Sequence, residues 1–427
     1  DRIETDSQDK ESVIRTLENL FLGFQGAGSG RGWCAQSFMP ISAGFLGGET
    51  IWKESQAKKS DIKNWEDLFS DRKFAKFFNM SQHLFLARGG EILYLQICNA
   101  LSQPKSEIKE WANSINLGLT DEEKDPEILH EGLEKELQNF KNHSPSALTQ
   151  IAEFIDGQLD TDTPEKTDWI DWEAGEKRFV DAGWCKKESW REGYMFAVEI
   201  HRLLRAGLDI VDRIHLMEIA CAMQVLRSLG AQTSRITKRE NPVSWPGYRI
   251  ALSAPADDRP DIRRLSQISV KTMEKQIYQS LRSGHVTLSG DAEQQRKTLD
   301  QADKSYGGKL FISMSKRIGL MIPKMGPGAR FVLNEKLLRF LVISSVPLGG
   351  RYTFDSFKQI LENRHGLVVD ADGLDRAGIW MNGTGIYLPA DTDQWLQQML
   401  EVAGFLVQLS DSCALVSNPA KDIDNEV

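Results

Sequence analysis

Two adjoining segments constrain the fold most, because both carry apolar side chains at helical spacing and both end in glycine. They are KESWREGYMFAVEIHRLLRAG (residues 187–207) and LDIVDRIHLMEIACAMQVLRSLG (residues 208–230). Their apolar residues recur every three to four positions, which is the period of an α-helix. A terminal glycine favours the left-handed conformation that ends helices, and a short link favours antiparallel packing. We predict a buried helical pair within a mainly α-helical protein.

Proline-rich stretches divide the chain into three predicted regions. The chain has 427 residues, more than the roughly 250–300 residues that one hydrophobic core serves. Four prolines fall within residues 242–260, which predicts a linker or an irregular crossover, and MIPKMGPGARF (321–331) predicts a second boundary. We therefore expect an acidic helical domain over 1–232, a basic helical middle region over 233–330, and a C-terminal domain with a short acidic tail over 331–427.

The C-terminal region has the element order of a winged helix. Asn334 and Thr353 are suited to cap helices over 335–345 and 354–365, and Gly366 is suited to end the second helix. A strand over 367–369, a loop, a third helix within 391–404 and two strands within 405–419 are expected to follow. Helix, helix, strand, helix and hairpin predict a winged-helix-like module.

The third helix of this module favours protein contact over DNA contact. The stretch DTDQWLQQMLEVAG (391–404) contains acidic residues and glutamines but no Lys or Arg. A helix that reads DNA needs basic or amide groups facing the groove, and its acidic side chains are repelled by phosphate. Trp395 and Met399 lie four residues apart and are candidates for a partner-binding stripe, the alternative being a place in the module's own core.

Basic residues are concentrated in the middle of the chain. The formal net charge is −9, yet residues 231–350 hold 20 Lys+Arg against 10 Asp+Glu, a local balance of +10 that leaves −19 for the rest. Such asymmetry is typical of a face that meets a phosphate-rich or acidic partner, although it also fits solvated helix faces. The candidate nucleic-acid-binding residues are Lys304, Lys309, Lys316, Arg317, Lys324 and Arg330.

No catalytic, metal or cofactor motif is evident in the sequence. The five cysteines are odd in number and far apart, which favours reduced thiols, and the seven histidines are scattered. GAGSGRG (26–32) follows a predicted helix and lacks the Gly-Lys-Ser/Thr ending of a phosphate loop. No apolar run reaches the roughly 18–20 residues that span a bilayer, and the acidic start is unlike a signal peptide. We expect a cytoplasmic protein with no catalytic residues, no metal and no cofactor.

Four segments carry a resemblance to a group of bacterial proteins. They are WCAQSFMPIS (33–42), FLARGGEILYLQICNAL (85–101), RYTFDSFKQILENRHGLVV (351–369) and FLVQLSDSCALVSNP (405–419). Together they resemble uncharacterised accessory proteins of bacterial multi-gene anti-phage systems, such as phosphorothioation-dependent and methylation-associated restriction systems. The resemblance implies a scaffold or adaptor in a defence complex and supplies no catalytic motif.

These observations predict a non-catalytic adaptor of a nucleic-acid-directed defence complex. Its expected partners are protein subunits of that complex, with an ATPase or a DNA-modifying enzyme as candidates. Non-specific contact with nucleic acid through the basic middle is also expected, and contact with a membrane is not. The alternatives are a cryptic nuclease subunit and a winged-helix transcriptional regulator.

Overall fold

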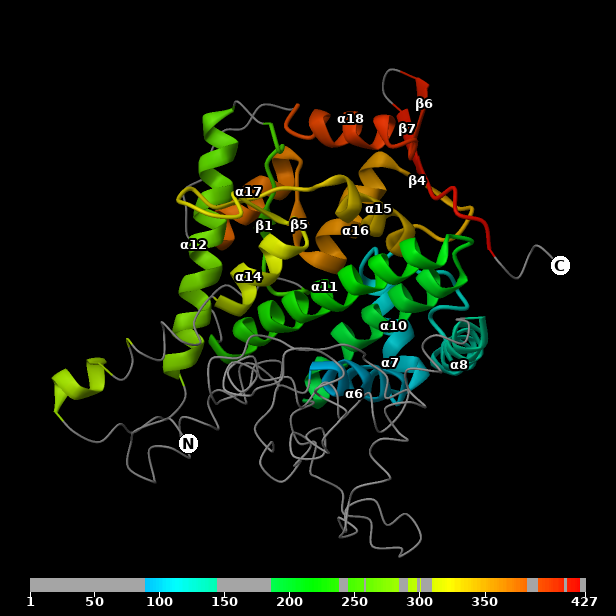
Figure 1. The fold of residues 1–427 in the computed structure, drawn as a ribbon, viewed down its shortest axis with the longest axis horizontal. Helices are drawn as coiled ribbons and strands as arrows, with labels where there is room; N and C mark the ends of the chain where they lie inside the picture. The colour runs from blue at the N-terminus through cyan, green and yellow to red at the C-terminus, as the bar shows by residue number, and fades with distance from the viewer. Residues whose placement is uncertain are drawn as a thin grey trace, which may run out of the picture.

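The computed structural model describes residues 89–143, 186–237, 245–256, 259–283, 291–297, 300, 309–381, 391–410 and 413–422. Predictions for residues 1–88 and 144–185, including the glycine-rich segment and the WCAQSFMPIS segment, lie outside these ranges. The described part is mainly α-helical, as predicted (Figure 1).

The predicted helical pair forms the centre of the molecule. Helix α10 (Trp190–Arg205) packs against α11 (Ile210–Thr237), and also against α6 (Gly89–Leu101), α8 (Pro126–His143) and α15 (Glu335–Ser345). Because neighbours surround α10, every residue from Glu192 to Leu204 is buried, charged ones included. The short helix α7 (Lys105–Ser114) and the 3-10 turn η2 (Lys187–Ser189) complete the end of the molecule where α6 and α8 lie.

Helix α11 does not end at Gly230, as the sequence pattern predicted, but continues for seven residues to Thr237. The glycine serves close packing here. A Cβ atom at Gly230 would lie 2.6 Å from the ring of Tyr248, so only the bare backbone lets this aromatic ring lie against the helix. The helix therefore runs through the position of the predicted boundary at residue 232.

The proline-rich stretch forms a buried crossover where it is described. Tyr248, Ile250 and Leu252 are buried, and strand β1 (Ile250–Ala251) pairs in parallel with β5 (Leu367–Val368), Ile250 lying opposite Leu367. The predicted strand at 367–369 thus belongs to a pairing that sequence reasoning did not foresee. It joins the middle of the chain to the C-terminal region.

The middle region contains three described helical segments and a hairpin. Helix α12 (Pro260–Ser283) is followed by helical residues 292–297 and then by α14 (Lys309–Arg317), with gaps in the described residues between them. Strands β2 (Met321–Ile322) and β3 (Arg330–Phe331) then pair antiparallel. The second predicted boundary is therefore the turn of this hairpin.

The C-terminal caps are confirmed in detail. The Asn334 side chain accepts a hydrogen bond from the Leu337 amide at 2.7 Å at the start of α15, and Thr353 accepts one from Ser356 at 3.2 Å at the start of α16 (Phe354–His365). Gly366 ends α16 with a φ of 66°. Strand β4 (Arg351–Thr353) lies between these two helices.

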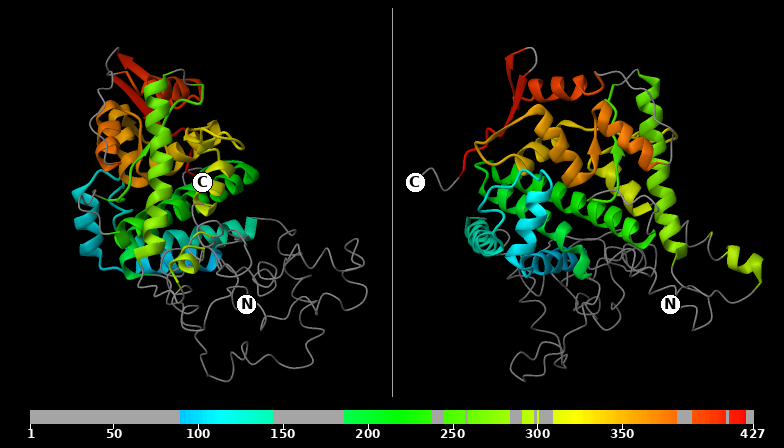
Figure 2. Two further views of the ribbon diagram at one scale, coloured as in Figure 1. Left: turned by 90° about the vertical axis from the view of Figure 1, so that its left-hand side faces the viewer. Right: turned by 180° about the vertical axis from the view of Figure 1, so that it is seen from behind.

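Beyond β5 the structure differs from the expected loop. Helix α17 (Ala371–Trp380) occupies part of it, capped by the Asp370 side chain, which accepts a hydrogen bond from the Gly373 amide at 2.8 Å. Helix α18 (Gln394–Val402) follows, and then β6 (Leu406–Ser410) and β7 (Cys413–Ser417), which form an antiparallel sheet of order β4-β7-β6. Figure 2 shows α18 and this sheet at the end of the molecule opposite α6 and α8.

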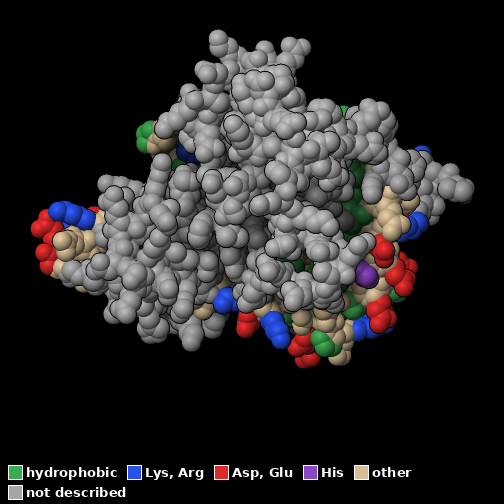
Figure 3. Space-filling view, turned by 60° about the horizontal axis from the view of Figure 1, so that its bottom comes forward, with side chains coloured by type: hydrophobic (Ala, Val, Ile, Leu, Met, Phe, Trp, Pro, Cys, Tyr) green, Lys and Arg blue, Asp and Glu red, His purple; other side chains and the backbone are tan. Residues whose placement is uncertain are grey.

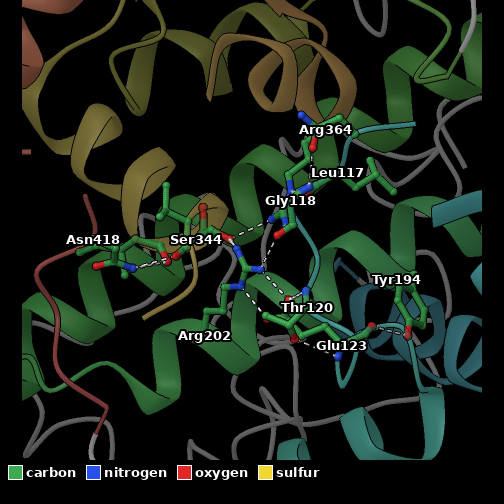
Figure 4. A network of polar contacts seen from close by, with 12 residues as sticks. Leu117, Gly118, Thr120, Glu123, Tyr194, Arg202, Ser344, Arg364 and Asn418 are labelled. Carbon is green, nitrogen blue, oxygen red and sulfur yellow. Dashed lines mark hydrogen bonds and ion pairs between the residues drawn. The ribbon is translucent and has the colours of Figure 1, made fainter. Parts of the chain in front are cut away.

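A large hydrophobic core joins most of these parts, with buried members from Ile92 to Ala420. A smaller cluster packs α17 onto α12, β1 and β5, and its buried members are Ala251, Leu265, Val368, Leu374 and Ala377. The interior also encloses charged side chains. Arg202 of α10 and Arg364 of α16 both donate to the carbonyls of Gly118 and Ser344 (Figure 4). Arg227 of α11 pairs with Glu199 at 2.5 Å. Within the described ranges, no helix is long and apolar enough to cross a membrane.

Candidate protein-docking site

A groove of about 730 Å³ runs alongside α18, between this helix and the starts of α12 and α15. Trp395, Met399 and Val402 of α18 line it. Their spacing of four and then three residues places them on one face of the helix. Val402 is 90% exposed, and with Trp395 and Met399 it makes the apolar surface of the groove contiguous.

The neighbouring face of α18 anchors the helix to the core. Leu396 and Leu400 are fully buried, and Asp393, just before the helix, forms an ion pair with Lys358 of α16. The helix therefore has two apolar faces, one that packs inward and one that lines the groove. A fixed helix with a second apolar face is suited to binding, because little order is lost on contact.

The opposite wall of the groove comes from the proline-rich crossover and two helix starts. Ile262 of α12 and Leu338 of α15 are both buried at its base, and Pro255 lies on the wall between them. The groove thus combines an apolar floor with apolar side chains from segments more than 60 residues apart in sequence.

The charges around the groove are mainly acidic. Asp391 and Glu335 line it together with Arg259. The Arg259 guanidinium lies 3.4 Å from the Asp391 carboxylate and 3.5 Å from that of Asp261. One arginine is thus shared by two carboxylates, which leaves the rim of the groove with an excess of negative charge.

Two polar atoms in the groove wall lack a hydrogen bond. The Thr392 hydroxyl and the Trp395 indole N–H are buried, and neither has a hydrogen-bond partner among the described residues. Most buried polar groups in proteins are paired, and an unpaired one costs about 1–3 kcal/mol. The Thr392 hydroxyl and the Trp395 N–H are therefore hydrogen-bonding groups that the described part of the fold leaves unpaired.

The structure brings the two predicted partner-binding residues together on this groove. Trp395 and Met399 are both half-buried; they line the groove and also pack against the core. The sequence left open whether these residues bind a partner or belong to the core of the module. In the structure each of them has one side on the groove and another against the core. Val402, seven residues after Trp395, extends the stripe and was missed, although the helical period pointed to it.

The predicted basic residues are not all on the surface. Lys304 lies outside the described residues, and Lys309 begins α14 without a described side chain. Lys316 is half-buried and Arg317 exposed at the end of α14, and Lys324 is exposed in the turn between β2 and β3. These three residues are the ones that the structure leaves at or near the surface.

Arg330 has a structural position instead. It is buried, and its guanidinium donates to the Ser253 hydroxyl and the Ala254 carbonyl, both at 2.7 Å, and to the Pro255 carbonyl at 2.8 Å. These bonds hold the segment that forms one wall of the groove. Nothing in the sequence indicates that Arg330 is buried, so its place near other basic residues suggested a phosphate contact.

No feature of the described residues indicates catalysis. Among them, no group of three or more His, Cys, Asp or Glu side chains is placed to hold a metal ion. Cys98, Cys221 and Cys413 are free thiols. Glu199 contacts Arg227 and His365 in the closed interior.

Comparisons with protein-family models, with curated proteins and with solved structures found no match to this chain.

Proposed function

We propose that this chain is a non-catalytic adaptor that binds another protein subunit through the groove beside α18. The observation that carries the proposal is the apolar stripe of Trp395, Met399 and Val402, which lines a groove of about 730 Å³ and ends in a side chain that is 90% exposed. Contiguous exposed apolar surface on an ordered protein is typical of an interaction site.

The chemistry of the groove specifies the kind of partner. Apolar walls favour one or two large aliphatic or aromatic side chains, and the acidic excess of Glu335 and Asp391 favours Lys or Arg beside them. The occupant that fits is a segment of a protein partner with apolar anchors and flanking basic residues. Such anchors supply most of the affinity in peptide grooves, and the charges set the choice of partner.

We also propose a winged-helix-like arrangement for the C-terminal region, with α18 as its third helix. The order α15, β4, α16, α18, β6 and β7 and the sheet order β4-β7-β6 support it, while α17 is an addition. Helix α18 has no Lys or Arg to offer to phosphate, which supports a protein-binding use of the module over a DNA-reading one.

We further propose, from the resemblance to anti-phage accessory proteins, that this adaptor works in a bacterial, cytoplasmic defence complex. Lys316, Arg317 and Lys324 are then the residues through which it contacts nucleic acid without sequence preference. This part of the proposal depends on the sequence resemblance and on the exposure of the basic side chains. The groove proposal is independent of both.

Selection from a random peptide library against the full-length chain tests the groove. We expect the selected peptides to share a large apolar residue flanked by Lys or Arg. Val402→Lys should weaken their binding at least tenfold by fluorescence anisotropy, because it adds a like charge at the apolar stripe. Val211→Lys is the matched control, since Val211 is also an exposed valine, at 55%, but lies at the start of α11. Peptides without basic flanks, or equal binding by both variants, would overturn the proposal.

A further inference from the structure

A second cavity, of about 460 Å³, lies between α8, α10 and the turn after α15. Helix α8, which lines it, lies at the other end of the molecule from α18 (Figure 1). Arg202 and Arg205 of α10 line the cavity, and so do Glu123 and Asp422. Each arginine forms an ion pair with one carboxylate, Arg202 with Glu123 and Arg205 with Asp422.

These pairs neutralise the arginines. Arg202 donates to both Glu123 oxygens at 2.6 Å and to the carbonyls of Gly118 and Ser344, so most of its donors are engaged (Figure 4). Burial alone would raise the pKa of Glu123, but the Arg202 guanidinium outweighs it and lowers the pKa to about 2. The wall is therefore not an anion site, because its fixed cations already hold fixed anions.

Two other groups in the wall have acceptor capacity that is not used. Glu136 of α8 is only 5% exposed. Among the described residues it forms an ion pair with Lys135 at 3.7 Å, too long for a hydrogen bond, and it also interacts electrostatically with Arg213 of α11. His201 of α10 is 8% exposed and has no hydrogen bond to any described residue. Burial first, and then Arg205, lower the pKa of His201 to about 4, so the imidazole is neutral at neutral pH and keeps one acceptor nitrogen.

A glycine makes room for the imidazole. Gly132 of α8 also lines the cavity, and a Cβ atom there would lie 2.6 Å from the Nε2 atom of His201. Any larger residue would push the ring into the empty space. Glycine inside a helix lowers stability relative to alanine, and at this position it leaves space for the ring and keeps the cavity open.

The mouth of the cavity is strongly acidic. Residues 121–136 contain eight Asp and Glu against two Lys, and acidic side chains gather over the α8 end of the molecule in Figure 3. Glu122 and Glu131 are exposed and line the cavity. Beside them lie apolar side chains, of which Ile128 is 49% exposed and Leu348 is half-buried.

We propose that this cavity binds a linear aliphatic polyamine. One ammonium group donates to the Glu136 carboxylate and the His201 imidazole inside, the methylene chain lies on Ile128 and Leu348, and a further ammonium group meets Glu122 and Glu131 at the mouth. A metal ion is a poorer occupant, because the described residues bring no three metal-binding side chains together, whereas hydrogen-bonded ammonium groups need only one carboxylate each.

Titration calorimetry with spermidine on the full-length chain, at physiological salt, tests the proposal. We expect saturable binding that Glu136→Gln weakens by about tenfold or more, since hydrogen bonds to charged groups are worth about 1.5–3 kcal/mol. The matched control is Glu134→Gln, an exposed position two residues away on α8 that does not line the cavity. Binding by this control should stay within about twofold of wild type.

A second variant guards against a loss caused by misfolding. Gly132→Ala displaces the His201 ring into the cavity and raises helix propensity, so it should weaken spermidine binding by about tenfold or more while circular dichroism shows full helix content. Three results would overturn the proposal: no saturable binding by the wild type, equal weakening by both glutamine variants, or displacement of spermidine by Mg²⁺ at the same charge concentration. The last would mean counterion association with an acidic surface only.

Discussion

The interior around α10 and the groove beside α18 reverse the usual distribution of side chains. Arg227, Glu199 and Arg364 are completely enclosed in the interior, whereas Val402 is 90% exposed at the groove. Buried charges lower stability unless each one is paired, and exposed apolar groups gain nothing in the isolated chain. The interior therefore shows how the fold tolerates charge, and the groove shows which surface the fold leaves for another molecule.

The two regions also differ in how their polar atoms are satisfied. Arg202 and Arg364 have carbonyl or carboxylate partners on nearly every side. Around Arg227 the pairing is incomplete, since its Nε and Nη1 atoms and both His365 nitrogens have no hydrogen-bond partner in the described part of the chain. The hydrogen bonds of Arg202 and Arg364 are thus nearly all satisfied. The cluster of Glu199, Arg227 and His365, by contrast, is held by very few polar contacts. Removing one of its members should have the largest effect in the protein.

Replacing Arg227 by Met should lower the free energy of unfolding by about 3–5 kcal/mol, because it leaves the buried Glu199 carboxylate without its cation. Urea unfolding followed by circular dichroism measures the change. The double variant Glu199→Leu with Arg227→Met removes both charges and should regain most of the loss. If Arg227→Met lowers the free energy of unfolding by less than about 1 kcal/mol, the buried Glu199–Arg227 pair does not distinguish the interior from the α18 groove.

Acid should destabilise the interior before it affects the groove. His201 has a folded-state pKa of about 4 against an ordinary value of 6.5, so the unfolded chain binds the proton more readily. The stability that this neutral histidine contributes is fully present above pH 6.5 and is lost as the pH falls toward 4. The shift corresponds to about 3 kcal/mol. His365, whose pKa burial lowers well below its ordinary value, acts in the same direction.

Thermal unfolding between pH 7 and pH 4 tests this expectation. The variant His201→Gln should show a flatter dependence on pH across that window, while keeping the part that His365 contributes. An unchanged pH profile in the variant would contradict the role given to His201.

Substitution of Arg330 should change stability but not nucleic-acid binding, and substitution of Lys324 should do the reverse. Arg330→Met should cost about 1–3 kcal/mol, because it leaves the hydroxyl and carbonyl acceptors of residues 253–255 unpaired, and it should leave the salt dependence of binding unchanged. Lys324→Met should leave stability unchanged and reduce the log–log salt slope by roughly 0.7–0.9. Urea unfolding and titration with duplex DNA at several salt concentrations measure both. A change of slope for Arg330 would return it to the phosphate-binding set.

Local signals in the sequence were sufficient for the helices and their caps. Helical periodicity and helix caps depend only on residues a few positions apart. The structure confirms the periodicity over 187–230 and the capping residues Asn334, Thr353 and Gly366. The Trp395 and Met399 stripe could also be predicted, since four residues bring two side chains to the same helical face. Each of these features follows from short-range geometry.

Features set by distant contacts could not be predicted. Gly230 signals a helix end, and only the ring of Tyr248 against it explains why the helix continues. The sequence indicated a strand at β5, but its partner β1 has only two residues and lies more than 100 positions earlier in the chain, so the pairing itself could not be predicted. The cavity between α8 and α10 depends on Gly132 and His201 meeting across two helices. A charged residue such as Arg330 looks exposed in any sequence until its partners are known.

The hydrogen bonds from Arg364 to the carbonyls of Leu117 and Gly118 can form only late in the synthesis of the chain. These groups are separated by 247 and 246 residues. Ribosomes add about 5–20 residues per second, so roughly 10–50 s pass between translation of the two sides of the contact. Throughout that interval the loop after α7 has no Arg364 guanidinium to donate to its carbonyls. Its final hydrogen bonds therefore form only after α16 has left the ribosome.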